Sequence, residues 1–211
     1  MSLDREFPVA AQERIAEAVR QAERSSTGQI VPVVVERSQP YEEAPWIAAV
    51  VAAALVTGIV ELLRWEPTVA ELFTLQILGG VMGWFAGRLA PVERLLAGRR
   101  HQEQAVHSRA EQAFFEHGLH QTRDGTGVLV FASLRERRAV VIGDRGIHER
   151  MGDAEWKRAI EALVEGMGRG SPGDGFVAAI AIVGARLAEH FPRQAGEPVL
   201  NELPDGLKRD A

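Results

Sequence analysis

The sequence predicts an α/β fold with a mixed sheet, interrupted by two long apolar helices. Residues 29–35 and 127–142 contain short runs of branched apolar side chains, which are typical of buried strands. Apolar residues at helical spacing before and after these runs predict amphipathic helices. Residues 45–63 and 72–90 are almost free of charge and are long enough to cross a bilayer.

The composition excludes several classes of function. With 46% hydrophobic residues, the 211-residue chain can bury a sizeable core. Its net charge of −5 argues against binding to nucleic acid, because such proteins usually carry a basic face. There is no cysteine, so disulfides, thiolate nucleophiles and cysteine-ligated zinc are excluded. The first 43 residues contain no apolar segment typical of a secretory signal peptide.

The chain is predicted to begin with an amphipathic helix over residues 8–25. Gly28 follows it, as glycine commonly follows a helix end. Residues 29–35 then form a strand. Because Pro32 cannot donate a ladder hydrogen bond, we expect an edge position or a bulge there.

The two apolar runs predict a transmembrane helical hairpin. At about 1.5 Å per residue, each reaches roughly 28 Å, close to the hydrocarbon thickness of a bilayer. Trp46, Trp65 and Trp84 lie near the ends of the runs, where interfacial aromatic residues are common. The alternative is a pair of buried helices in a soluble protein, but runs of this length seldom occur in soluble folds.

The hairpin also predicts partners and an orientation. Gly79, Gly83 and Gly87 form one helical stripe that could dock other membrane proteins, since small residues let membrane helices approach closely. Both hairpin ends join the soluble part, whose side carries most of the neighbouring arginines. The positive-inside rule therefore places that part in the cytoplasm, with the chain integral to the cell or inner membrane. These arginines are Arg37, Arg88, Arg94, Arg99 and Arg100, against Arg64 in the short loop.

The remaining chain predicts a strand hairpin surrounded by helices. A helix over residues 102–117 precedes apolar strands at 128–132 and 139–142. The first two strands of the protein should be parallel, because a helix connects them, and the second and third should be antiparallel. Helices follow from Asp153 onwards, and we expect residues 193–211 to be a polar, fraying tail.

This topology predicts a candidate site at one edge of the sheet. The antiparallel pairing brings the chain before Gly127 close to the chain after Ile142, so Asp124 and Asp144 become neighbours. The same edge collects three further polar residues, Arg145, His148 and Asp153. Carboxylate oxygens suit Ca²⁺ or Mg²⁺, and we therefore consider Asp124, Asp144 and Asp153 as metal ligands.

Each of these residues also has an ordinary structural explanation. Asp124 precedes Gly125 in a typical turn pair, Asp153 is a typical helix N-cap, and Asp144 would form a local ion pair with Arg145. In a catalytic role, Asp144 would act with the metal, Arg145 could pair with a phosphate group, and His148 could move a proton. Both interpretations remain open from the sequence.

With residues 44–91 set aside, the order of elements resembles the TPM domain, in particular its bacterial membrane-anchored branch. The matching segments are Thr27-Gly-Gln-Ile-Val31, Gly127-Val-Leu129, Arg137-Arg138, Asp144-Arg-Gly-Ile147, Asp153 and Gly173-Asp174. The resemblance implies a three-layer α/β/α fold, divalent-metal binding through acidic loops and, for some members, acid phosphatase activity. It divides the chain into residues 1–38 and 102–192 of the domain, the hairpin at 44–91 and the tail at 193–211.

Two hypotheses follow about function. One is a metal-binding or assembly module at the membrane surface, which the lack of an obvious nucleophile favours. The alternative is a divalent-metal-dependent phosphatase acting on phosphate esters. The sequence leaves open whether the protein is an enzyme.

Overall fold

The computed structural model describes residues 3–39, 43–96, 98–122, 124–148, 150, 153–193 and 203–210. The chain divides into two compact units. The first unit combines Met1–Ser38 with Ala105–Ala211, and the second is Gln39–Gln104. The chain leaves the first unit soon after its first strand and returns to it within a long helix.

The first unit contains a mixed four-stranded sheet in the order β3-β2-β1-β4. β1 spans Gln29–Val35, β2 spans Gly127–Ser133, β3 spans Arg138–Gly143 and β4 spans Lys208–Asp210. β1 is parallel to β2, with Gln29 opposite Gly127, and β2 is antiparallel to β3, with Val128 opposite Gly143. These pairings confirm the predicted mixed sheet and its α/β class.

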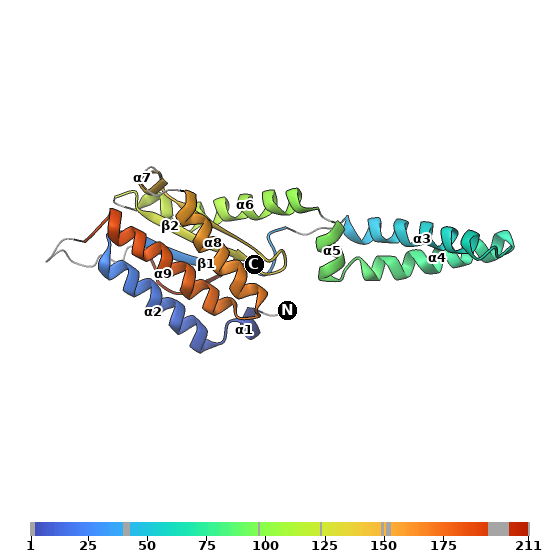
Figure 1. The fold of residues 1–211 in the computed structure, drawn as a ribbon, viewed down its shortest axis with the longest axis horizontal. Coiled ribbons are helices and arrows are strands. Elements are labelled where there is room, and N and C mark those ends of the chain that lie inside the picture. Colours follow the sequence, from blue (N-terminus) through green and yellow to red (C-terminus); the bar gives the residue numbers. More distant parts are fainter. Residues whose placement is uncertain are drawn as a thin grey trace. The chain divides into compact units, whose positions relative to one another are not determined.

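Helices flank this sheet in the first unit (Figure 1). They are α1 (Leu3–Glu6), α2 (Val9–Ser25), α6 (Arg99–Glu116, which begins in the second unit), the 3₁₀ helix η1 (Leu119–Gln121), α7 (Arg145–His148), α8 (Asp153–Gly168) and α9 (Pro172–His190). The predicted helix boundaries agree with α2 and α6 within a few residues. α9 begins at Pro172, as proline is well tolerated in the first turn of a helix.

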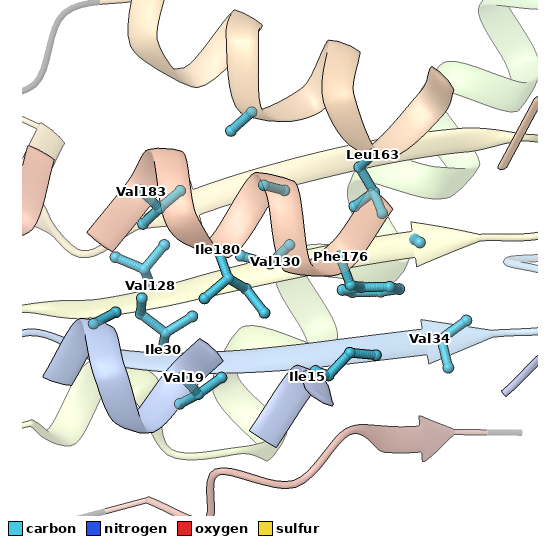
Figure 2. Close-up of a cluster of buried hydrophobic side chains, with 14 of the residues drawn as sticks. Ile15, Val19, Ile30, Val34, Val128, Val130, Leu163, Phe176, Ile180 and Val183 are labelled. Carbon is cyan, nitrogen blue, oxygen red and sulfur yellow. The ribbon is translucent and has the colours of Figure 1, made fainter. Parts of the chain in front are cut away.

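One face of the sheet is covered by α2, α8 and α9. Figure 2 shows Ile30 and Val34 of β1 and Val128 and Val130 of β2 directed toward these helices. Ile180 of α9 packs among them and is fully buried. Each buried side chain of this size contributes about 1.5–3 kcal/mol to stability. This larger core fixes the three helices on the sheet.

The other face of the sheet is covered by α6 and η1. Val31 and Val33 of β1 and Phe131 of β2 pack there against Phe114 of α6 and Leu119 of η1. Alternate residues of one strand thus enter opposite cores, as the geometry of a strand requires. Burial on both faces explains why β1 and β2 are apolar throughout instead of alternating with polar residues.

The C-terminal segment differs from the predicted fraying tail. Residues Lys208–Asp210 form β4, which pairs in parallel with Val33–Val35 of β1. No signal in the sequence indicated this strand, because its residues are charged and do not enter a core. Pro32 lies just before the stretch of β1 that pairs with β4, so its missing N–H costs no hydrogen bond on that side.

The second unit is built around two long apolar helices, α3 (Ala44–Leu62) and α4 (Val69–Ala86), followed by the short α5 (Ala90–Leu96). Thr68 caps α4 with a reciprocal capping box involving Glu71. Between the helices, Nε2 of Gln76 donates to Oγ1 of Thr57 at 2.8 Å. α3 and α4 therefore form an antiparallel pair joined by a polar contact within an apolar surface.

The glycine stripe of α4 lies against α3 of the same chain. A Cβ on Gly83 would stand 2.5 Å from the carbonyl oxygen of Ala48, and one on Gly87 would stand 2.6 Å from Cα of Pro45. A Cβ on Gly79 would meet Val56 at 2.7 Å. The sequence predicted that this stripe could dock other membrane proteins. In the structure the stripe packs within the hairpin, and docking of other membrane proteins stays a prediction that would involve other faces of α3 and α4.

Candidate functional site

The candidate site lies at the edge of the sheet where β1 and β2 begin and β3 ends. The loop before β2 is fixed by Thr122, whose carbonyl oxygen accepts from the N–H of Gly125 at 3.1 Å. Its Oγ1 accepts from the N–H of Thr126, also at 3.1 Å. Gly125 has a φ of 62°, a conformation that favours glycine. The resulting tight turn holds Asp124 at the surface.

The loop after β3 is fixed in a similar way. The N–H of Asp144 donates to the carbonyl oxygen of Gly127 at 2.8 Å and continues the β2–β3 pairing past the last strand residue. Oδ1 of Asp144 accepts from the N–H of Arg145 at 2.7 Å. The Asp144 side chain thus holds the first turn of α7 and is oriented by it.

The two loops contact each other, as the strand topology predicted. A Cβ on Gly125 would stand 3.6 Å from Oδ2 of Asp144. A Cβ on Gly146 would stand 3.1 Å from the carbonyl oxygen of Gly125 and 3.7 Å from that of Asp124. Asp124 is exposed and Asp144 is half-buried. The edge therefore places the Asp144 carboxylate beside the turn that carries Asp124, with the backbone carbonyls of Asp124 and Gly125 close by. Carboxylate and carbonyl oxygens are the donors that hard cations prefer.

Of the other predicted site residues, the structure describes the side chain of Arg145 but not those of His148 and Asp153. His148 ends α7 and Asp153 begins α8, but the side chains of both lie outside the described residues. Arg145 is exposed at the start of α7. Among the side chains that the structure describes, no group of three His, Cys, Asp or Glu residues is arranged to hold a metal ion. Metal binding by Asp124, Asp144 and Asp153 stays a prediction.

Buried residues behind the edge hold α7 and α8 in place. Ile147 is fully buried, and Trp156 of α8 is 7% exposed. A Cβ on Gly143 would stand 3.0 Å from the Trp156 ring and 3.1 Å from Ile147, so a side chain at the end of β3 would require these two residues to shift by a few tenths of an ångström. Within the described part of the chain, the indole N–H of Trp156 has no hydrogen-bond partner.

Asp174, the acidic position that the family resemblance suggested, lies elsewhere. It is in the first turn of α9, and its Oδ1 accepts from Nη1 of Arg14 at 2.7 Å. The start of α9 lies near Leu134, which follows β2, and so at the opposite edge of the sheet from Asp144. The ion pair with Arg14 gives Asp174 a structural role between α2 and α9.

In the described part of the first unit, two buried carboxylates escaped the sequence interpretation. Glu23 of α2 is 2% exposed, and burial raises its pKa to about 7 against an opposing hydrogen bond from the N–H of Ile30. Glu136, in the turn between β2 and β3, is 4% exposed. A signal for Glu23 was present, because it continues the apolar stripe of Ile15 and Val19 at i+4 spacing. Glu136 gave no such signal, since it lies in a charged turn.

Comparison with known proteins supports the interpretation of the first unit. The family model of the TPM domain matches residues 92–186. The predicted resemblance to the TPM domain is thereby confirmed for this part of the chain. A search of the curated proteins found no match.

A solved structure shares the fold. The NMR structure of the BA42 protein from the psychrophilic bacterium Bizionia argentinensis superimposes with a TM-score of 0.61. The alignment covers 99% of each chain at 18% sequence identity. Identity at this level shows a common fold and leaves the activity to be established from the residues of this chain.

Proposed function

We propose that the chain is a TPM-type domain anchored in a membrane by the α3–α4 hairpin, where it serves as a metal-binding or assembly module. The observation that carries the proposal is the outer surface of the hairpin. Leu55, Phe73 and Met82 are 60%, 60% and 74% exposed, and almost none of the most apolar stretch of either helix is buried. An apolar surface of this extent is unfavourable in water and favourable in lipid.

Residues near the ends of the hairpin support the same proposal. The guanidinium of Arg88 stacks over the Trp84 ring at 3.7 Å, and Trp84 contacts Trp46 edge to face with ring centroids 6.4 Å apart. Amphipathic rings and snorkelling arginines are typical of the headgroup region. The arginine count on this side of the hairpin, against Arg64 in the short loop, favours a cytoplasmic domain.

The lack of cysteine makes this topology directly testable. Extraction of membranes with alkaline carbonate should leave the chain in the pellet. Single cysteines from Glu66→Cys, in the short loop, and Lys157→Cys, exposed on α8, should react with an impermeant maleimide from opposite sides of the membrane. Release of the chain by carbonate would contradict anchoring. Labelling of Lys157→Cys in intact cells would contradict the cytoplasmic orientation alone.

The edge formed by the Asp124 and Asp144 loops is the proposed metal-binding part of the module. Its donors fit Ca²⁺ or Mg²⁺, which take carboxylate and carbonyl oxygens at flexible sites. Asp124, Asp144 and Asp153 would hold the ion. A bound cation would supply positive charge that recruits an anionic group or a partner carboxylate to this edge.

The alternative function is a divalent-metal-dependent phosphatase at the same edge. The contact between the two aspartate loops, with the exposed Arg145 directly after Asp144, favours it. Arg145 would bind the phosphate of an ester, His148 would move a proton, and the ion would polarise the phosphate.

A single pair of measurements separates the two functions. The purified chain in detergent is titrated with Ca²⁺ or Mg²⁺ while the amide signals of residues 124–127 and 143–147 are followed by NMR. Hydrolysis of p-nitrophenyl phosphate is measured in the same samples. Shifts that disappear in Asp144→Asn, without hydrolysis, support the module. Hydrolysis that depends on the metal and on Asp144 supports the phosphatase. An absence of shifts contradicts the metal site in both.

A further inference from the structure

A second site is built at the opposite edge of the sheet, beyond the carboxyl end of β2. A cavity of about 180 Å³ opens there. It is lined by the apolar residues Leu134, Met167 and Pro172, by Gly168 and Gly170, and by two charged residues, the half-buried Glu6 and the exposed Arg137. In α/β folds, ligands commonly bind beyond the carboxyl ends of parallel strands. The edge formed by the Asp124 and Asp144 loops lies at the amino end of β2 and is separate from this cavity.

The wall that carries Arg137 is held rigidly. The carboxylate of Glu136 accepts from the Ser133 hydroxyl and, at 3.2 Å, from the N–H of Ser38. The N–H of Leu134 donates to the carbonyl oxygen of Val35 at 3.1 Å. Arg137 itself has a φ of 53°, which is unfavourable for a residue with a side chain. Such strain persists where the surrounding structure fixes it, and it is common at binding sites.

The facing walls are equally fixed. The chain passes from α8 to α9 in a tight corner, because a Cβ on Gly166 would stand 2.5 Å from Cα of Gly175. This corner fixes Met167 and Pro172. Glu6 precedes Phe7, which is fully buried against Phe176 with ring centroids 5.8 Å apart. Each lining residue therefore sits on or next to an anchored segment, and the cavity is formed without a ligand.

The charged groups of Glu6 and Arg137, the two charged residues that line the cavity, have no interaction partners among the described residues. Within the part of the chain that the structure describes, neither the Glu6 carboxylate nor the Arg137 guanidinium forms a hydrogen bond or an ion pair. They also do not pair with each other, although they line the same small cavity. An acidic and a basic residue that line the same small cavity, beside the apolar Leu134 and Met167, suit a molecule that carries both a carboxylate and an ammonium group.

We infer that this cavity binds a small zwitterion of the α-amino acid class, with its carboxylate on Arg137, its ammonium group on Glu6 and an apolar side chain over Leu134 and Met167. Guanidinium groups match the planar carboxylate through two parallel hydrogen bonds. The cavity volume of about 180 Å³ is large enough for an amino acid with a short apolar side chain.

The test uses the full chain in detergent micelles and three probes of closely similar shape. L-valine carries both charges, isovalerate lacks the ammonium group and isobutylamine lacks the carboxylate. Binding is followed through the methyl signals of Leu134 and Met167. We expect valine to shift both signals and to bind about tenfold more tightly than either analogue, because each analogue leaves one charge of the cavity unpaired.

Two charge-neutral variants identify the groups. Arg137→Gln and Glu6→Gln should each lower the affinity for valine about tenfold, whereas the exposed Arg158→Gln and Glu13→Gln should leave it unchanged. The amide spectrum of each variant shows whether the fold is kept. The inference is overturned if valine at about 10 mM, the millimolar range of weak ligands, shifts neither methyl signal. It is also overturned if isovalerate binds as tightly as valine and Glu6→Gln has no effect.

Discussion

The carboxylate of Glu23, near the end of α2, accepts the backbone N–H of Ile30 in β1 at 2.9 Å. Arg193 secures the same corner by donating to the carbonyl oxygens of Glu23 at 2.9 Å and Ser26 at 2.7 Å. A buried acid thus fixes the connection between the first helix and the first strand, and it does so next to Asp205 of the C-terminal segment.

This arrangement predicts that stability falls as the pH rises toward neutrality. Burial raises the pKa of Glu23 from its ordinary value of 4.5 to about 7 in the folded chain. Between these values the folded state binds a proton that the unfolded state does not, so the free energy of unfolding decreases with pH and levels off above 7. The loss amounts to about 3 kcal/mol. Urea unfolding between about pH 5 and pH 8 measures it.

The variant Glu23→Gln provides the comparison. It keeps an acceptor for the Ile30 N–H but cannot ionise, so it should unfold at a higher urea concentration than the wild type at pH 8 and lack this part of the pH dependence. An identical pH dependence in both proteins would show that another group is responsible.

The close contact between α3 and α4 predicts that a larger side chain lowers the stability of the hairpin only at positions where the two helices touch. Gly83→Leu should force the helices apart, because even its Cβ would meet the Ala48 carbonyl oxygen at 2.5 Å, at a cost of about 1–3 kcal/mol. Gly58→Leu is the matched control, since a Cβ there meets no atom within 4 Å. Thermal unfolding of both variants in detergent should show a loss for Gly83→Leu alone. Equal stability would contradict the close packing.

The C-terminal strand is predicted to depend on one aspartate. Oδ2 of Asp210 lies 3.2 Å from Nη2 of Arg109 and 3.2 Å from Nε2 of His117, and all three side chains are largely buried. Asp210→Asn should weaken these contacts by about 1 kcal/mol and speed hydrogen exchange at Val33–Val35, which pair with β4. The exposed Glu111→Gln on α6 serves as control. Unchanged exchange in Asp210→Asn would mean that β4 is held by its backbone pairing alone.

The turn between β2 and β3 is predicted to tolerate glutamine but not alanine at position 136. Glu136→Ala leaves the Ser133 hydroxyl and the Ser38 N–H without their acceptor, and each unsatisfied buried group costs about 1–3 kcal/mol. Glu136→Gln retains an amide oxygen and should lose less. The exposed Glu161→Ala provides the baseline. If both variants at 136 unfold at the same urea concentration as this control, the carboxylate does not hold the turn.

Strand pairing was predictable because it depends on short-range patterns. Branched apolar runs identified β1, β2 and β3, and the crossover and hairpin connections fixed their relative directions. From those directions alone, the loops of Asp124 and Asp144 were expected to meet, and they do. The same reasoning could not supply a third ligand, since the orientation of Asp153 depends on how α8 begins.

Other features required the packed chain. The glycine stripe of α4 is visible in the sequence, but it could pack against α3 or against a helix of another protein. The antiparallel packing of the hairpin shows that it contacts α3. β4 has no apolar strand pattern, because Lys208 and Arg209 are not core residues. It forms a strand because its backbone pairs with the edge of β1 that β2 leaves open. The cavity between Glu6 and Arg137 joins segments more than a hundred residues apart, and no local pattern relates them.

The sequence by itself determined the longer helices, the first three strands and their directions, the apolar character of the hairpin and the meeting of the two aspartate loops, because hydrophobic period and chain connectivity act over short distances. Only the tertiary structure decided which small-residue faces meet, what covers the edge of β1 and which charges share a cavity. Those outcomes depend on the burial of surfaces contributed by distant segments, and the free energy of each contact exists only after the whole unit has folded.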